Sequence, residues 1–506
     1  MADDCHRAHA RSGSTAAWWL AAFAFAYPAF LAGEGAKRSM ELTPCAREAG
    51  VPGAECGTLE VFENRAAAQG RIIPLKVIVL PSLGLETKPD ALFLLAGGPG
   101  MPASELANFG EKYMRRIRES REIVLVDQRG TGDLSLMQCS DNGMEGTYFD
   151  IEEKYLYETL RNCLEEFDAD PRHYTTPVAM DDLDDVRAAL GYEEINLWGG
   201  SYGTRAALIY LRRHPERTRA LILDGVAPTA IRLPLHAGED AHRAMELMLD
   251  HCEADSDCTE AFPELRQKYS DLLQRSAKTP EKVNAPHPRT GEPLDLELDR
   301  EKIVLLLRAV LYNADATRLL PLVIERAHAG DFGPLLALND PIGDSLSKIN
   351  VPMMFSILCA EDIRLVSEND LAQLSEEPFL GSNIIDRWKK VCEFWPAGEL
   401  PPGYHDPVVS DKPVLILSGD LDPVTPPRWG EYLTQHLTNS LHVIVPGAAH
   451  GTSGHGCVPK MMYTFLDQAN FAELETGCVD QLTRPMFFQS FAGPRVGAAP
   501  AEGGTQ

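Results

Sequence analysis

Short apolar runs separated by amphipathic segments dominate the first half of the chain. Two strand-like runs at residues 58–62 and 72–80 predict a hairpin that opens a sheet. Further apolar runs, each of a length that suits one buried strand, lie at residues 91–96, 122–126, 195–198, 219–225, 413–418 and 441–445. Helical patterns at residues 181–190 and 206–211 fall between these runs. The alternation predicts an α/β fold with a mostly parallel central sheet.

The pattern changes between about residues 231 and 405. Helical periodicity replaces the buried strands there, at residues 241–250, 265–275, 303–312 and 319–328. Proline-rich connectors separate these segments. We therefore predict an α/β core in two parts, residues 45–230 and 406–490, with a helical cap formed by residues 231–405. Residues 491–506 are rich in Ala, Gly and Pro and are predicted to be disordered.

Length and charge narrow the classes of function. A chain of 506 residues suits a large α/β core with an insertion. Its 74 acidic and 47 basic residues give a net charge of -27. This excess argues against nucleic acid as a partner and against binding to an anionic membrane surface. It is compatible with substrates that carry an amine.

The first 36 residues predict an export signal. His6, Arg7 and Arg11 precede an apolar stretch at residues 16–32, and small residues follow at 33–36. We favour a cleaved signal and a periplasmic or secreted protein. The alternative is an uncleaved signal that holds the protein at a membrane, but a proline within the apolar stretch speaks against a membrane anchor.

Cysteine usage agrees with export. Of 11 cysteines, Cys5 lies in the predicted signal. The other ten are Cys45, Cys56, Cys139, Cys163, Cys252, Cys258, Cys359, Cys392, Cys457 and Cys478. An even number in an exported chain favours disulfides, and their order suggests five pairs of sequence neighbours. Because the sequence contains no Cys-x-x-Cys, we predict no metal site.

The chemistry of the chain centres on residues 199–203, Gly-Gly-Ser-Tyr-Gly. They follow a predicted strand and precede a predicted helix, which is the context of a nucleophile elbow. The sharp turn leaves room only for glycine on either side of Ser201, and it places the hydroxyl at a helix N-terminus. The residues 97–100, Gly-Gly-Pro-Gly, also follow a strand. Backbone N–H groups of that loop and of Tyr202 are candidates for an oxyanion hole.

A third strand ends in the polar loop 127–132. Its Asp127 and Arg129 could bind substrate, because ligands bind at the C-terminal ends of parallel strands. We favour a structural interpretation in which the two side chains pair internally and hold the loop.

The last two predicted strands each end in a candidate partner for Ser201. Asp422 follows residues 413–418, and His450 follows residues 441–445, so serine, acid and base occur in the chain order of an α/β-hydrolase triad. Serine needs an imidazole as general base, and the imidazole needs a carboxylate to fix its tautomer.

Rivals exist for both partners. Asp420 and Asp224 compete with Asp422, which we prefer because the prolines that follow it would fix its loop. His442 and His455 compete with His450; the first begins a strand, and the second lies further from a strand end.

Together these segments resemble the prolyl iminopeptidase and tripeptidyl aminopeptidase family of α/β hydrolases. The resemblance rests on residues 97–100, 127–132, 199–203, 419–426 and 450–451. Residues 457–478 and the region of Cys359 and 392–396 are similar to the exported, tripeptidyl-aminopeptidase-like branch. The resemblance covers residues 45–480 and implies an α/β-hydrolase fold with an inserted cap.

The resemblance also implies roles for individual residues. Ser201 would be the nucleophile, Asp422 the acid and His450 the base, and the N–H groups of Gly98 and Tyr202 would form the oxyanion hole. The implied reaction is acyl transfer from a peptide with a free N-terminus, and it needs neither a metal nor an organic cofactor.

An aminopeptidase must also bind the substrate's α-ammonium group. Family members use carboxylates supplied largely by the cap, which makes Glu361 and Asp362 the candidates here; a solvated acidic loop is the alternative interpretation. Two other functions remain open. A carboxylester hydrolase could use the same triad. A binding domain that has kept the fold without activity is the non-enzymatic alternative, although all three triad candidates are present.

Overall fold

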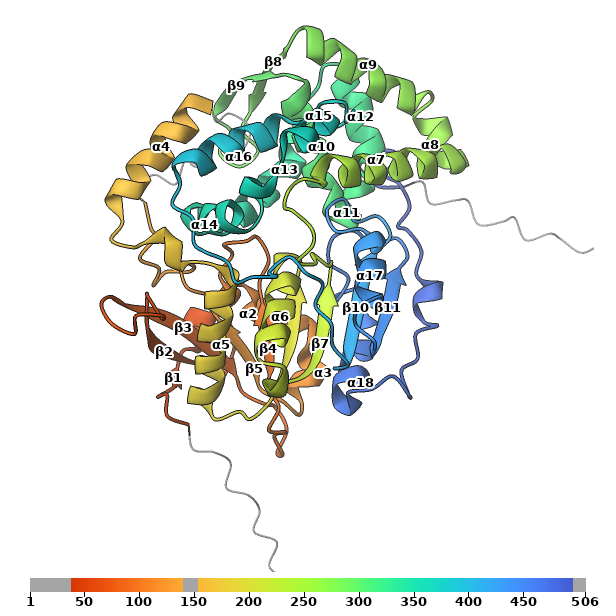
Figure 1. Ribbon diagram of the computed structural model, residues 1–506. Helices are drawn as coiled ribbons and strands as arrows, with labels where there is room; N and C mark the ends of the chain where they lie inside the picture. Colours follow the sequence, from red (N-terminus) through yellow and green to blue (C-terminus); the bar gives the residue numbers. More distant parts are fainter. Residues whose placement is uncertain (1–37, 140–152, 495–506) are drawn as a thin grey trace, which may run out of the picture.

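A sheet of nine strands forms the centre of the computed structural model, which describes residues 38–139 and 153–494 (Figure 1). The strand order is β1-β2-β3-β5-β4-β6-β7-β10-β11. The strands are β1 Thr43–Pro44, β2 Glu55–Phe62, β3 Ile72–Leu80, β4 Leu92–Leu95, β5 Ile123–Val126, β6 Ile195–Gly200, β7 Thr218–Asp224, β10 Val414–Gly419 and β11 Ser440–Val445. From β5 to β11 every neighbouring pair is parallel. The predicted α/β fold with a mostly parallel sheet is confirmed.

The three strands at the N-terminal edge of the sheet, β1, β2 and β3, pair antiparallel. β2 pairs with β3 along its whole length, from Glu55 opposite Val79 to Phe62 opposite Ile72, so the hairpin is confirmed. β3 also pairs antiparallel with β5, which joins the hairpin to the parallel strands.

Helices cover both faces of the sheet because its central strands are apolar on both sides. In β4, Phe93 and Leu95 pack with α5 and α6 on one face, whereas Leu92 and Leu94 pack with α2, α3 and α18 on the other. Outside residues 231–405, the described chain forms the helices α1 Ala46–Ala49, α2 Ala107–Tyr113, α3 Arg115–Arg118, α4 Glu153–Glu166, α5 Thr176–Leu190, α6 Tyr202–Arg213, α17 Pro427–Thr434 and α18 Val458–Gln468, of which α4 lies beside α16 of the cap (Figure 1).

Between β7 and β10 the chain leaves the sheet and builds a separate layer (Figure 1). This layer contains α7 Ala237–Ala254, α8 Ser256–Ala261, α9 Leu265–Lys278, α10 Arg300–Leu311, α11 Ala314–Thr317, α12 Leu320–His328, α13 Gly333–Leu346, α14 Val351–Glu361, α15 Glu368–Ser375 and α16 Asn383–Phe394. Most of these helices share an apolar core of their own. The apolar side chains of α14 instead join the core beneath the layer, so α14 ties the cap to the sheet.

The cap also contains an antiparallel hairpin that we did not predict. β8 Glu281–Pro286 pairs with β9 Pro293–Leu298. Alternating apolar and polar residues at 294–298 are the local signal for it. Two prolines and many charged residues obscure that signal, and the hairpin gains its stability by packing Val283 and Leu296 into the cap core.

The ten described cysteines form five disulfides between sequence neighbours, Cys45–Cys56, Cys139–Cys163, Cys252–Cys258, Cys359–Cys392 and Cys457–Cys478. The predicted export signal lies outside the described residues, as does most of the predicted disordered tail. Across residues 38–139 and 153–494, no helix combines the length and the apolar character that crossing a membrane requires.

Candidate active site

Ser201 occupies a strained turn between β6 and α6. Its φ is 55° and its ψ is -125°, a conformation that L-residues rarely adopt. Close backbone approaches explain the flanking glycines. A Cβ on Gly199 would lie 2.4 Å from the carbonyl oxygen of Gly203, and a Cβ on Gly203 would lie 2.1 Å from that of Leu95. The turn therefore has the geometry that the elbow motif predicts.

His450 and Asp422 lie on neighbouring loops because β10 and β11 are adjacent parallel strands. The Nδ1 of His450 is 2.8 Å from Oδ2 of Asp422. The other carboxylate oxygen, Oδ1, accepts the N–H groups of Val424 and Thr425, both at 2.8 Å. These bonds fix the buried carboxylate so that one oxygen faces the imidazole.

Thr425 is a site residue that our sequence analysis missed. Its hydroxyl donates to Oδ2 of Asp422 at 2.9 Å, and it lies 3.2 Å from Nδ1 of His450. The only sequence signal is its place three residues after the acid, at the position where an Asx-type turn closes.

The electrostatics of this pair favour a charged imidazole beside a charged carboxylate. Burial acts to raise the pKa of Asp422, but His450 and the N–H donors outweigh it and lower the pKa below its ordinary value. Burial likewise acts to lower the pKa of His450, and the carboxylate of Asp422 outweighs it and raises the pKa. This arrangement would stabilise the imidazolium that forms when a histidine takes a proton from serine.

The end of β7 brings the nucleophile loop and the histidine together. The backbone N–H of Ser201 donates to the carbonyl oxygen of Asp224 at 2.9 Å. The next residue, Gly225, lies against His450, since a Cβ on it would be 3.3 Å from the imidazole Cε1. Within the described part of the chain, the Ser201 hydroxyl and the imidazole are not hydrogen-bonded. Such contacts can be long in a resting enzyme and shorten in the substrate complex.

The glycine loop after β4 faces Ser201. A Cβ on Gly97 would lie 3.1 Å from the Cβ of Ser201 and 3.6 Å from its Oγ. The next residue, Gly98, has a φ of 111°, and no described acceptor binds its N–H. Tyr202 is the first residue of α6, where backbone N–H groups have no intrahelical partner. Two donors are therefore available near the nucleophile.

Three of the rival residues have other contacts. The carboxylate of Asp224 accepts the N–H groups of Thr452 and Ser453, each at 2.8 Å, and thereby holds the loop that follows His450. Asp420 accepts the N–H of Gly447 at 2.8 Å. The Nε2 of His442 lies 2.9 Å from the Ser418 hydroxyl on the strand next to it.

The fourth rival, His455, lies in the turn after His450. Its backbone N–H donates to the carbonyl oxygen of Thr452 at 2.9 Å, and its ring nitrogen Nδ1 is buried without a hydrogen bond in the described structure. It is not bonded to either acidic rival of Asp422.

Glu361 and Asp362 are fully buried, so the interpretation as a solvated acidic loop is wrong. Asp362 forms an ion pair with Arg205 at 2.8 Å. Glu361 accepts the N–H of Thr176 at 2.7 Å and is hydrogen-bonded to Tyr404. Burial raises the pKa of Glu361 to about 7. These contacts join α14 to α5 and α6, and binding of the α-ammonium by either carboxylate stays a prediction.

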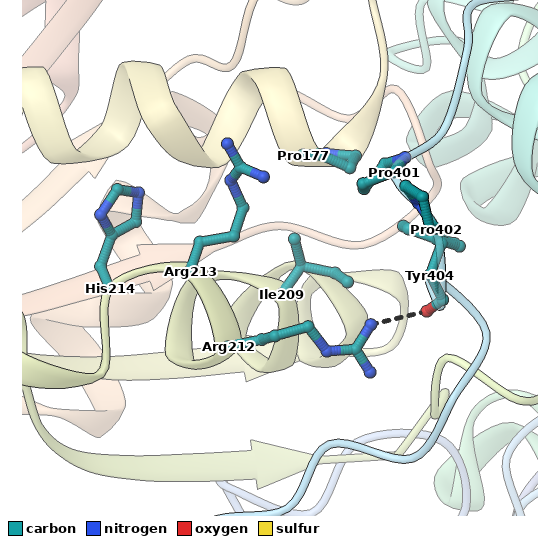
Figure 2. Close-up of a pocket in the computed structure, with 8 residues that line it drawn as sticks. All are labelled: Pro177, Ile209, Arg212, Arg213, His214, Pro401, Pro402 and Tyr404. Carbon is teal, nitrogen blue, oxygen red and sulfur yellow. Dashed lines mark hydrogen bonds between the residues drawn. The ribbon is translucent and has the colours of Figure 1, made fainter.

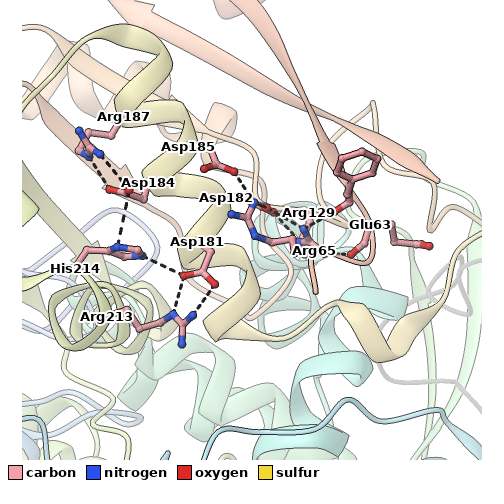
Figure 3. Close-up of polar contacts among 11 residues, drawn as sticks. Glu63, Arg65, Arg129, Asp181, Asp182, Asp184, Asp185, Arg187, Arg213 and His214 are labelled. Atoms are coloured by element: carbon pink, nitrogen blue, oxygen red, sulfur yellow. Dashed lines mark hydrogen bonds and ion pairs between the residues drawn. The ribbon is translucent and has the colours of Figure 1, made fainter. Parts of the chain in front are cut away.

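Asp127 and Arg129 hold their loop, but they do not pair with each other as we expected. Arg129 is buried and binds Asp182 of α5 through Nε at 2.6 Å (Figure 3). The carboxylate of Asp127 accepts the N–H of Ser104 at 2.7 Å. Both side chains thus anchor the loop to neighbouring elements.

A cavity of about 340 Å³ lies between the cap and the candidate catalytic loops. Its lining includes Gly98 and Pro99 of the glycine loop, Val424 of the Asp422 loop, and Tyr312 at the end of α10. The ring of Tyr312 lies edge-on to His450, with 5.3 Å between the ring centroids. The sequence does not mark Tyr312, because its contact with His450 depends on how the cap packs above the sheet.

Another cavity of about 340 Å³ lies elsewhere, between α5, α6 and the segment that leads back from the cap (Figure 2). Arg212 is one of its lining residues and donates to the Tyr404 carbonyl oxygen at 2.8 Å. None of the triad or oxyanion-hole candidates lines this cavity. The cavity beneath the cap, in contrast, is lined by the oxyanion-hole candidate Gly98 and by Tyr312, whose ring contacts His450, and we take it as the candidate site.

Parts of the chain are similar to known proteins. Residues 377–478, which include Asp422 and His450, match the family described as TAP-like protein. Over 470 residues the chain is 27% identical to serine protease Hip1 of Mycobacterium tuberculosis, covering 84% of this chain and 88% of that protein. Over 477 residues it is 23% identical to a tripeptidyl aminopeptidase of Streptomyces coelicolor, covering 87% and 85%.

A shorter match of 141 residues, 28% identical, links 27% of the chain to 34% of a proline iminopeptidase of Neisseria gonorrhoeae. Among solved structures, a proline iminopeptidase of Mycobacterium smegmatis aligns at a TM-score of 0.36 and 16% identity, covering 82% of this chain and 99% of that one. The chain is thus similar over most of its length to serine proteases and tripeptidyl aminopeptidases of the α/β-hydrolase type, and it is a serine hydrolase of the peptidase type.

Proposed function

We propose that the protein is an exported serine aminopeptidase that cleaves peptide bonds near a free N-terminus. The observation that carries this proposal is the 2.8 Å bond between Asp422 and His450, at the sheet edge where Ser201 forms a strained elbow. The names of the matched relatives, a tripeptidyl aminopeptidase among them, support the aminopeptidase assignment. Five disulfides support export, because disulfides persist in oxidising compartments.

The proposed reaction proceeds through an acyl-enzyme. The Nε2 of His450 takes the proton of the Ser201 hydroxyl while Oγ attacks the carbonyl carbon of the scissile bond. Asp422 keeps Nδ1 protonated and stabilises the imidazolium. The imidazolium then gives its proton to the departing amine, the C–N bond breaks, and water, activated by the same histidine, releases the N-terminal acyl part.

The tetrahedral intermediate carries negative charge on its former carbonyl oxygen. The N–H groups of Gly98 and Tyr202 are our candidates to bind that oxygen. Gly98 follows Gly97, which lies against Ser201, and Tyr202 follows Ser201 itself; in the described residues neither N–H donates to a backbone acceptor. Loss of one such donor reduces kcat by roughly 10²- to 10³-fold in serine hydrolases.

The cap supports cleavage at a chain end rather than within a chain. The cavity holds about 340 Å³ and is bounded by α10, α14 and α16 above the catalytic loops. A cavity of this size fits a few residues of peptide and would exclude a folded chain. We expect the N-terminal residues of the substrate to enter it and the remainder to leave past the catalytic loops.

Hydrolysis of a defined panel tests the proposal. The panel contains aminoacyl-, dipeptidyl- and tripeptidyl-arylamides with a free amine, the same compounds N-acetylated, and short-chain aryl esters. We expect turnover of free-amino amides only, and a loss on the order of 10⁴- to 10⁶-fold in Ser201→Ala. Equal or faster turnover of acetylated amides or esters would favour the carboxylester hydrolase instead.

A second comparison checks the choice of nucleophile. Ser453→Ala removes another buried serine on the same sheet edge, one whose hydroxyl donates to Asp224 rather than facing the glycine loop. Retained turnover in Ser453→Ala, together with its loss in Ser201→Ala, assigns the reaction to Ser201. A reaction that survives in Ser201→Ala would refute the acyl-enzyme mechanism proposed here.

A further inference from the structure

Five charged side chains line the cavity beneath the cap: Asp299, Glu301, Lys302, Arg308 and Arg387. Two of them neutralise each other, because Arg387 forms an ion pair with Glu301. The carboxylate of Asp299 accepts the N–H of Lys302 at 2.9 Å and caps the N-terminus of α10. A helix N-terminus favours such a negative charge, so this carboxylate also has a structural partner.

Arg308 differs from these residues. Its guanidinium lies over the ring of Tyr312, the residue that follows α10, with 5.2 Å between the guanidinium carbon and the ring centroid. Its Nε is buried without a hydrogen-bond partner, and no carboxylate in the described ranges lies within ion-pair distance of the guanidinium. An arginine keeps its charge at any relevant pH. A buried donor left unpaired is unfavourable, which favours binding of an anion at this position.

The position of this charge relates it to the reaction. Tyr312 contacts both Arg308 and His450: the guanidinium carbon lies 5.2 Å from its ring centroid, and the centroid of the imidazole lies 5.3 Å from it. The backbone N–H of His450 also donates to the Tyr312 carbonyl oxygen at 3.2 Å, which fixes α10 relative to the histidine. Extended peptide spans about 3.3–3.6 Å per residue, so a group bound at Arg308 lies within a few residues of the scissile bond.

We propose that Arg308 is a specificity-determining residue that binds a carboxylate of the peptide substrate within this cavity. The proposal rests on the proposed peptidase function. A carboxylate matches the planar guanidinium, which can donate two parallel hydrogen bonds to it, whereas the α-ammonium would be repelled. The carboxylate belongs either to an acidic side chain near the cleavage site or to the C-terminus of a short peptide.

Two substrate series distinguish these sources. In the first, tripeptidyl-arylamides carry Glu or Gln in turn at each of the three positions. In the second, free tetrapeptides are compared with their C-terminal amides, and chromatography follows their cleavage. We expect wild type to prefer the carboxylate in one series by about 10- to 100-fold in kcat/KM, the range expected for hydrogen bonds to a charged group. Arg308→Gln should reduce that preference to within about threefold of unity, and Arg308→Lys should retain part of it.

Arg387→Gln is the matched control, because it removes another guanidinium from the same cavity, one already paired with Glu301. The carboxylate preference should persist in this variant. A wild type without preference in either series, or an Arg308→Gln variant that keeps the full preference, would overturn the proposal. A general fall in kcat/KM without a change in the ratio would mean that Arg308 acts only structurally, and it would overturn the proposal as well.

Binding separates this inference from the proposed function. Calorimetry on Ser201→Ala compares a free tripeptide with its C-terminal amide, and a tripeptide amide that contains Glu with its Gln counterpart, without any turnover. The Arg308 site is supported if Ser201→Ala binds a carboxylate ligand more tightly than its amide counterpart and Ser201→Ala/Arg308→Gln does not. This conclusion holds even if none of the arylamides is hydrolysed. Equal binding of each carboxylate ligand and its amide counterpart overturns the site even if aminopeptidase activity is present.

Discussion

The pairing of Asp422 with His450 gives the sharpest test of the proposed triad, because the same loop contains a matched control. Asp422→Asn keeps the shape of the side chain, and its amide oxygen can still accept the N–H groups of Val424 and Thr425. Its NH₂ group, however, would face Nδ1 of His450 and favour the tautomer in which Nδ1 is unprotonated. That tautomer places a proton on Nε2, where the base must accept one from serine.

The expected loss follows from that tautomer. In a Ser-His-Asp enzyme the equivalent change of aspartate to asparagine lowers kcat by about 10⁴-fold, or about 5 kcal/mol. The carboxylate of Asp420, two residues earlier, accepts the N–H of Gly447 and is not bonded to His450. We therefore expect Asp420→Asn to change kcat by less than about tenfold.

The assay is steady-state hydrolysis of a free-amino arylamide, measured from pH 5 to 9 for wild type and both variants. Asp422 raises the pKa of His450 against the effect of burial. The base acts when neutral, so the acid limb of kcat/KM in wild type should lie above the ordinary histidine pKa of about 6.5. In Asp422→Asn the residual activity should have its acid limb at lower pH. Similar losses in both variants, or an unchanged acid limb, would refute the assignment of Asp422.

Three further predictions concern the fold around the site. Burial raises the pKa of Glu361 to about 7, so the contribution of this side chain to stability is present below the unfolded-state pKa of about 4.3 and is lost as the pH rises through 7. In Glu361→Gln, the free energy of unfolding measured by chemical denaturation should therefore fall less between pH 5 and 7.5 than it does in wild type. A fall equal to that of wild type would contradict this prediction. Gly203→Ala would place a Cβ 2.1 Å from the Leu95 carbonyl oxygen, so we expect the free energy of unfolding to fall by at least about 2 kcal/mol. A variant as stable as wild type would show that the backbone at this turn has room for a side chain. Replacement of Cys359 and Cys392 by serine removes a disulfide between residues 33 positions apart and should lower the free energy of unfolding by about 2–4 kcal/mol in the same assay. An unchanged free energy of unfolding would mean that this disulfide does not restrict the unfolded chain.

Features of the site that depend on chain neighbours were predictable. The elbow at Ser201 is encoded by two glycines, a strand before it and a helix after it, all within about 20 residues. Asp422 and His450 were selected because each follows a strand, and parallel strands bring their C-terminal ends to one edge of a sheet. Their 2.8 Å contact then follows from the adjacency of β10 and β11.

Features that depend on the packing of the cap were not predictable. Glu361 and Asp362 have the sequence of an exposed acidic pair, but the fold buries them against Arg205. Arg308 is the only polar residue between Ile303 and Leu311, but the sequence does not show which surface Arg308 and Tyr312 face in the folded protein. Their contacts arise because α10 crosses above the loop of His450.

By itself the sequence determined the strands, the elbow, the order of the triad candidates and the pairing of cysteines along the chain. The spacing of hydrophobic residues, the backbone conformations of glycine and the ends of strands depend on residues only a few positions apart in the chain. Only the tertiary structure decided which carboxylate meets the imidazole, which acidic residues are buried, and which arginine of the cap faces the cavity without a partner. Asp422 and His450 are 28 positions apart, whereas Asp362 and its partner Arg205, and Tyr312 and His450, are more than 100 positions apart. These contacts depend on how the chain packs in three dimensions, because burial of apolar side chains fixes the arrangement of the elements and polar groups then pair with the neighbours that this arrangement provides.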